Sequence, residues 1–381
     1  MELPRLTIRA LGATPVLVPM RYALGTSAAT VRRAPLLLVD LETHQGVTGH
    51  AYQFCYRTAA APAIAGFLDD MLEMIAGAPV VPENLWALLS KRYTLIGVQG
   101  IVRMAMSLVD VAGWDALAQA AGLPLARLLG GEPRPIPAYN SNALGLVAPA
   151  GPEDPPRRSW SALADDAEAL VAGGFLGVKL RLGYATLEED LAAVRAVRRR
   201  IADEVALMVD FNQALSREDG VARARALDGE GIYWIEEPIR HDDYDGCAAI
   251  AAAVATPVQI GENFSQVYDM ERALAARACD CVMPDLERIG GITGWRRAAA
   301  LAADATMPMS SHLYPEVSAH LLSVTPTAHW LEYVDWMNPL LAEPLVVVDG
   351  HAVPSSRPGL GLAWNDEMVR RYQLPAADDR L

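Results

Sequence analysis

Three carboxylates recur at one interval in the second half of the chain. Asp210, Glu236 and Glu262 are 26 residues apart, and each closes a short apolar run. One strand, one helix and two loops fill such an interval, so parallel strands would bring these side chains to one edge of a barrel. Three oxygen ligands suit a hard divalent cation better than zinc, which prefers His and Cys. The spacing therefore predicts a Mg2+ site.

A histidine and an aspartate end two successive apolar runs farther along the chain. His312 follows Ser310 and Ser311, and Asp285 closes the run before it. Adjacent strands would place the carboxylate against the imidazole, where it would hold the tautomer and raise the pKa of the histidine. A lone histidine is more often structural, but this pairing predicts that His312 is a general base assisted by Asp285.

Two cations lie one residue apart on an expected strand. Lys179 and Arg181 would therefore point to the same face, where they form structural salt bridges or hold a substrate carboxylate. Glu332 closes the last apolar run and can donate a hydrogen bond to an oxygen that gains charge. Asn212 follows Asp210 by two residues and contacts either the substrate or a metal ligand. Together these groups predict abstraction of a proton next to a carboxylate, with an enediolate stabilised by metal, Lys179 and Glu332.

The elements that must position these residues form an α/β protein. Strands followed by helices predict an α+β capping domain over 1–133. Alternating strands and helices predict a (β/α)8 barrel over 134–340, and 341–381 is expected to return to the capping domain. Within the first domain, 22–35 is rich in small residues. Taken alone, that stretch is more typical of a surface connection than of a mobile flap.

Composition excludes some partners. The net charge of −14 argues against nucleic acid and anionic membrane surfaces. Four cysteines show no disulfide or zinc spacing, and no apolar run reaches membrane length. A cytoplasmic protein that binds a small-molecule carboxylate is expected.

Ordered motifs across nearly the whole chain resemble the mandelate racemase subgroup of the enolase superfamily. The motifs are WDALAQAAGLPLARLLGG, Lys-x-Arg at 179–181, VDFNQ, WIEEP, GEN, MPDLERIGGITGW, MPMSSHLYPEVSAHLL and TPTAHWLE. The resemblance implies a modified barrel with a capping domain, bound Mg2+ and a homo-oligomeric enzyme. It implies Asp210, Glu236 and Glu262 as ligands, His312 with Asp285 as base, Glu332 as electrophilic acid, and Lys179 and Ser141 as substrate contacts. It also implies that the flap at 22–35, with Leu24, Phe54 and Tyr56, shapes the substrate pocket.

Two departures from the subgroup bear on the reaction. The second cation of the subgroup's Lys-x-Lys pattern is the base opposite the histidine, and here it is Arg181. At pH 7 an unshifted Lys costs about 4.6 kcal/mol to neutralise and an Arg roughly 7.5 to 9, so Arg181 would be a poor base. A proline-rich loop at 147–160 also looks longer than its counterpart and would overhang the catalytic mouth.

Three functions remain open at this point. Racemisation or epimerisation of a 2-hydroxycarboxylate is favoured by the near-complete match. A one-base dehydratase of a sugar acid or related 2,3-dihydroxy acid, using His312, is the alternative favoured by Arg181. A non-catalytic binding protein on the same fold is the third.

Overall fold

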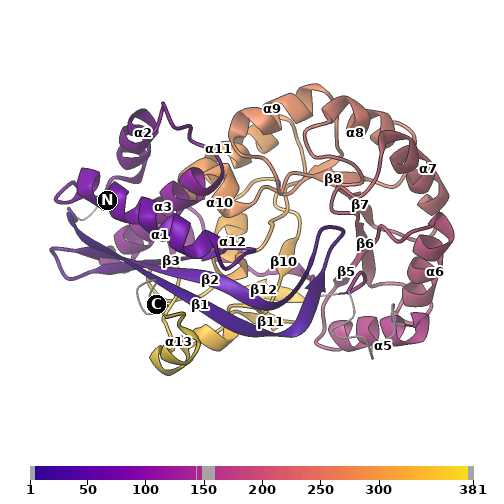
Figure 1. Cartoon of the computed structure of the whole chain (residues 1–381), viewed down its shortest axis with the longest axis horizontal. Helices are drawn as coiled ribbons and strands as arrows, with labels where there is room; N and C mark the ends of the chain where they lie inside the picture. Colours follow the sequence, from indigo (N-terminus) through magenta and orange to yellow (C-terminus); the bar gives the residue numbers. More distant parts are fainter. Residues whose placement is uncertain (1–4, 143, 148–158, 376–381) are drawn as a thin grey trace.

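The computed structural model describes residues 5–142, 144–147 and 159–375. Most of the proline-rich loop predicted at 147–160 lies outside these residues. The chain forms a capping domain beside a ring of parallel strands, and the β1–β2 hairpin reaches from one to the other (Figure 1).

The capping domain pairs an antiparallel sheet with helices. The sheet order is β1-β2-β3. Helix α3 is buried along most of its length because it packs against β2 and β3 and against α10 and α11. The elements are β1 (Ile8–Gly25), β2 (Thr30–Thr43), β3 (Thr48–Phe54), α1 (Ala60–Ile75), α2 (Pro82–Arg92), α3 (Gly100–Ala120) and α4 (Leu125–Leu128).

The second half of the chain builds the expected parallel strands. The strands pair in chain order from β4 to β9, and β10 pairs with β4. They are β4 (Ile136–Asn140), β5 (Gly177–Arg181), β6 (Ala206–Asp210), β7 (Trp234–Glu236), β8 (Val258–Ile260), β9 (Cys281–Val282) and β10 (Leu331–Tyr333). These strands do not close a barrel by themselves. Met309 completes the ring through single bridges to Val282 of β9 and to Ala328 before β10.

Helices lie along the outside of these strands (Figure 1). They are α5 (Trp160–Val171), α6 (Leu187–Arg198), α7 (Arg217–Leu227), α8 (Tyr244–Ala251), α9 (Val267–Ala275) and α11 (Gly291–Asp304), with α10 (Leu286–Ile289) and α12 (Pro315–Ser323) following the site residues. Thr186 and Glu189 form a reciprocal capping box that starts α6. Each crossover returns the chain to the same end of the ring, which is why functional residues gather there.

The C-terminal segment joins both domains. Its elements are η1 (Asn338–Leu340), β11 (Val346–Val348), β12 (His351–Val353) and α13 (Asp366–Tyr372). Strand β12 pairs with β4, so the first part of the segment extends the barrel sheet. Farther on, Trp364 Nε1 donates to Asp40 Oδ1 at 2.7 Å, and Gln373 bridges Val16 in the capping domain.

The stretch at 22–35 is not the surface connection that its composition alone favoured. Strands β1 and β2 run to Gly25 and from Thr30, so the turn is confined to the residues between them. The hairpin tip contacts the barrel, where Ser27 Oγ donates to Asn212 O at 2.8 Å. A Cβ on Gly25 would lie 1.9 Å from Leu146 O, so this close approach requires glycine.

Across residues 5–142, 144–147 and 159–375, no helix combines the length and apolarity needed to cross a bilayer. The four cysteines are buried free thiols.

Candidate active site

The three spaced carboxylates meet at one end of the barrel strands. Asp210 ends β6, Glu236 ends β7, and Glu262 follows β8 by two residues. One oxygen from each lies within 4.8 Å of the others. Burial raises the pKa of Asp210 and the pKa of Glu236, and the nearby charge of Lys179 partly offsets this rise. Crowded carboxylates of this kind need a cation, and an all-oxygen donor set fits a hard divalent ion.

Lys179 lies among these carboxylates. Its Nζ is 2.6 Å from Glu236 Oε1, 2.8 Å from Glu332 Oε1 and 3.4 Å from Asp210 Oδ2. Burial would lower the pKa of Lys179, but the carboxylates outweigh burial and raise it well above the usual value. Lys179 is therefore a fixed positive charge beside the candidate metal site.

Arg181 points to the same end of the barrel and is held by Ser141. Its two terminal nitrogens donate to Ser141 O at 3.2 Å and to Ser141 Oγ at 3.1 Å. Both side chains are buried. Arg181 Nε has no hydrogen-bond partner among the described residues, so its N–H group could donate to a ligand.

His312 and Asp285 form the predicted pair. His312 Nδ1 lies 2.7 Å from Asp285 Oδ2, and the two residues are also joined by a parallel backbone bridge. His312 Nε2 faces Glu262 Oε2 at 3.3 Å. Burial opposes the imidazolium, but Glu262, Glu332 and Asp285 outweigh it and raise the pKa of His312 to about 8. The imidazole is thus oriented by one nitrogen and presents the other beside a metal ligand.

Glu332 lies between the cation and the base. Its Oε1 is 2.8 Å from Lys179 Nζ, and its Oε2 accepts a hydrogen bond from Leu313 N at 2.8 Å. Burial alone would raise the pKa of Glu332, but Lys179 and His312 hold it below the usual range. In this arrangement the carboxyl is an acceptor, so the expected role as hydrogen-bond donor stays a prediction.

Strand order places His312 and Arg181 on opposite sides of the mouth. Arg181 ends β5, whereas the segment with His312 lies between β9 and β10. The three metal-ligand candidates lie at the ends of β6 and β7 and just after β8, on the arc between them. The imidazole and the guanidinium therefore flank the candidate metal site from different strands.

Asn212 supports the metal site and the hairpin. Its backbone N and its Nδ2 donate to the two carboxylate oxygens of Asp210, at 2.7 Å and 2.9 Å. Its carbonyl accepts from Ser27 at the hairpin tip, while its Oδ1 has no partner within the described chain.

Aromatic side chains from both domains pack together beside the mouth. The Phe54 ring centroid is 4.5 Å from that of Tyr56 and 4.7 Å from that of Trp336. Trp336 was not among the predicted site residues, because its segment carries no motif. Leu24 is buried in the hairpin, and its contact with a substrate stays a prediction.

Arg288 is a further residue that the sequence reasoning missed. Its NH1 group donates to Glu262 O at 2.8 Å and to Asn263 Oδ1 at 3.0 Å, and its guanidinium lies 5.0 Å from the Tyr56 ring centroid. Arg288 follows Asp285 by three residues, which places both side chains on the same face of a helical turn. This spacing is the sequence feature that could have indicated that Arg288 lies near the site.

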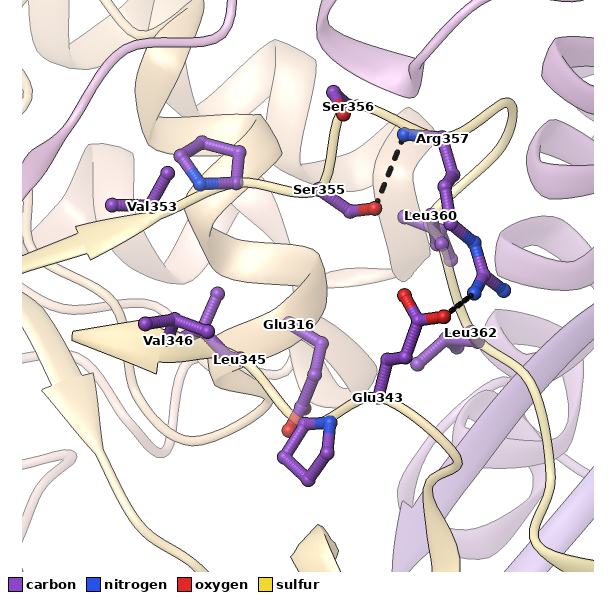
Figure 2. Close-up of a pocket in the computed structure, with 13 residues that line it drawn as sticks. Glu316, Glu343, Leu345, Val346, Val353, Ser355, Ser356, Arg357, Leu360 and Leu362 are labelled. Carbon is purple, nitrogen blue, oxygen red and sulfur yellow. Dashed lines mark hydrogen bonds and ion pairs between the residues drawn. The ribbon is translucent and has the colours of Figure 1, made fainter.

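A separate cavity lies between α12 and the C-terminal strands (Figure 2). It encloses about 480 Å³, and Glu343 and Arg357 pair across its edge at 2.8 Å. None of the predicted catalytic or metal-binding residues lines this cavity, so it is separate from the candidate active site.

Known proteins resemble the chain along most of its length. Solved structures include an enolase from alpha proteobacterium bal199 with bound magnesium, 42% identical with a TM-score of 0.92 over 97% of this chain and 100% of that one. An enolase from Bradyrhizobium complexed with magnesium and mandelic acid is 39% identical, with a TM-score of 0.90 over 98% of this chain and 100% of that one. The L-talarate/galactarate dehydratase of Salmonella typhimurium is 30% identical over 350 residues, which are 91% of this chain and 85% of the relative.

Two family descriptions match in sequence. "Mandelate racemase / muconate lactonizing enzyme, N-terminal domain" matches residues 9–130, and "Enolase C-terminal domain-like" matches residues 162–368. The first match falls on the capping domain and the second on the barrel with most of the C-terminal segment. The chain therefore belongs to the mandelate racemase/muconate lactonizing enzyme family of the enolase superfamily.

Proposed function

We propose that the protein is a Mg2+-dependent enzyme that removes the α-proton of a 2-hydroxycarboxylate with one base and then expels a β-hydroxyl group. The observation that carries this proposal is the asymmetry of the mouth, with an oriented imidazole on one side and a guanidinium on the other. The dehydratase relative supports the reaction type. The bound magnesium of the two structural neighbours supports the cofactor.

The metal would be held by Asp210, Glu236 and Glu262. When bound there, Mg2+ supplies positive charge to the carboxylate oxygens of the substrate and makes the α-proton more acidic. The residues of the chain carry the remaining steps.

The proton moves through His312. Its Nε2 takes the α-proton, and the electron pair of the broken C–H bond passes into the carboxylate to give an enediolate. Asp285 stabilises the imidazolium through the 2.7 Å contact at Nδ1. Lys179 stabilises the enediolate as a fixed charge.

Elimination then uses the same imidazole. As the enediolate re-forms the carboxylate, its electrons form a C=C bond and the C–O bond of the β-hydroxyl breaks. His312 returns its proton to that oxygen, which leaves as water, and the enol product becomes a 2-keto acid. One residue serves as base and then as acid, so no second base is required.

Racemisation or epimerisation is the second candidate, favoured by the Bradyrhizobium enolase that binds mandelic acid. It requires proton delivery on the Arg181 side. Presenting a neutral guanidine at pH 7 costs roughly 7.5 to 9 kcal/mol from ordinary pKa values, which disfavours Arg181 as a base but leaves it suited to hold an anionic oxygen.

The test is incubation of the Mg2+-loaded protein in D2O with galactarate, D-gluconate and each enantiomer of mandelate. NMR reads deuterium at the α-carbon, a 2-keto acid assay reads elimination, and polarimetry reads inversion. We expect a keto acid from a polyhydroxy acid and little inversion of mandelate. Rapid inversion of mandelate would favour the racemase. Metal binding without exchange from any compound would favour a non-catalytic protein.

A further inference from the structure

We propose that Tyr56 and Arg288 form a subsite for an oxygen atom on the substrate chain beyond C2, supplied by a hydroxyl or by a second carboxylate. The inference deepens the proposed function and rests on it.

The Tyr56 hydroxyl is the first observation. It is buried and has no hydrogen-bond partner among the described residues. The Tyr56 ring lies 5.0 Å from the Arg288 guanidinium, whose NH1 group is 3.7 Å from Glu262 Oε1, so Tyr56 lies at the catalytic mouth. A buried polar group without a hydrogen-bond partner is destabilising, and a ligand oxygen would supply the missing partner.

Tyr56 is held in a conformation that its residue type disfavours. Its φ is +57°, in the left-handed region. The ring contacts both the Phe54 ring and the Arg288 guanidinium. The surrounding contacts therefore maintain a strained backbone, which is common where a side chain must face a ligand.

Arg288 brings a second donor to the same place. Within its side chain, only the NH1 group makes hydrogen bonds to the described part of the chain, namely to Glu262 O and Asn263 Oδ1. The side chain is 16% exposed, and NH1 lies 3.7 Å from Glu262 Oε1. Its Nε and NH2 groups therefore remain available next to a metal-ligand candidate.

The two groups define the chemistry of the ligand. A guanidinium only donates hydrogen bonds, and a phenol donates or accepts, so together they suit a hydroxyl or carboxylate oxygen. A phenyl ring would leave both unpaired. Tyr56 follows β3 of the capping domain and Arg288 lies in α10 of the barrel, so the subsite lies where the two domains meet.

The test compares Tyr56→Phe with Tyr268→Phe, a control at a 66% exposed tyrosine. We measure kcat and KM for α-proton exchange with galactarate, D-gluconate and mandelate. Tyr56→Phe should lower kcat/KM for the two polyhydroxy acids about 10- to 100-fold and change that for mandelate less than about threefold. If Tyr56→Phe changed kcat/KM equally for all three compounds, or changed it for none of them, the proposed subsite would be wrong.

Arg288→Gln distinguishes the two oxygen sources. If the subsite binds a second carboxylate, the variant should lose more activity on galactarate than on gluconate, which lacks that group. If it binds a hydroxyl, the losses should match. An Arg288→Gln variant that keeps native kcat/KM on both acids would contradict the inference.

If the native protein exchanges the α-proton of none of these compounds, the proposed function is wrong, but the subsite can still be tested. The subsite is then decided by calorimetric binding of galactarate to the Mg2+-loaded protein. Weaker binding to Tyr56→Phe but not to Tyr268→Phe supports the subsite, and equal binding to all three proteins overturns it.

Discussion

Asp285 Oδ2 lies 2.7 Å from His312 Nδ1, while the other carboxylate oxygen of Asp285 accepts backbone hydrogen bonds from Glu287 and Arg288 at the start of α10. The N-terminus of α10 therefore holds the Asp285 carboxylate in place, and the carboxylate in turn orients the His312 imidazole. Its orientation does not depend on the substrate, so His312 Nε2 faces the mouth in advance of binding.

Asp285→Asn should slow α-proton exchange by about 10² to 10⁴-fold, because the amide favours the wrong tautomer and no longer stabilises the imidazolium. Asn is also a good helix cap, so the thermal unfolding midpoint should change little. Deuterium incorporation measured beside circular dichroism checks both parts. A variant that folds and exchanges at the native rate would exclude this role for Asp285.

Glu236→Gln should abolish metal binding, because one of three oxygen ligands becomes a neutral amide. In the native protein, Mg2+ at 100 times its dissociation constant should stabilise the fold by about 2.7 kcal/mol, which thermal unfolding with and without EDTA will detect. Mg2+ should not raise the unfolding temperature of Glu236→Gln. It should raise that of Glu218→Gln, a control at an exposed glutamate, as much as that of the native protein. Native activity in excess EDTA would rule out the metal assignment.

The candidate catalytic and metal-binding residues could be predicted from the sequence because each ends an apolar run. Parallel strands bring the ends of such runs together. The 26-residue interval therefore predicted the proximity of Asp210, Glu236 and Glu262. Arg288 was not accessible in this way, since its partners Tyr56 and Asn263 come from other elements. Non-local side-chain contacts of this kind leave no periodic signal.

Two features of the fold could not be predicted from the sequence, for related reasons. The hairpin strands β1 and β2 extend through small residues because ladder hydrogen bonds do not require β-branched side chains, so composition favoured a connection there. The pairing of β12 with β4 joins segments about 215 residues apart, and no local pattern specifies it.

His320 should make the protein sensitive to acid. Burial in α12 lowers the pKa of His320 to about 4, below the ordinary value near 6.5. Between these values the unfolded chain binds the proton and the folded chain does not, so stability falls as the pH drops from 6.5 to about 4. The loss from this residue reaches up to about 3 kcal/mol.

Urea unfolding at pH 7 and pH 5 checks this sensitivity. His320→Leu should show a smaller loss of unfolding free energy between the two values than the native protein, and His44→Gln at an exposed histidine should match the native loss. An unchanged pH dependence in His320→Leu would show that other groups carry the effect.

Arg181→Lys should increase inversion at the α-carbon. In the native protein, exchange should be fast for the enantiomer whose proton faces His312 and much slower for the other, because the opposite side presents a guanidinium held by Ser141. A lysine in the same buried place can lose its proton at far lower cost, since burial shifts an ammonium toward neutrality by up to about 3–5 pKa units. NMR of deuterium incorporation with polarimetry, for both mandelate enantiomers and both proteins, gives the comparison. Equal exchange of the two enantiomers by the native protein, with inversion lost in Arg181→Lys, would show instead that Arg181 itself works as a base.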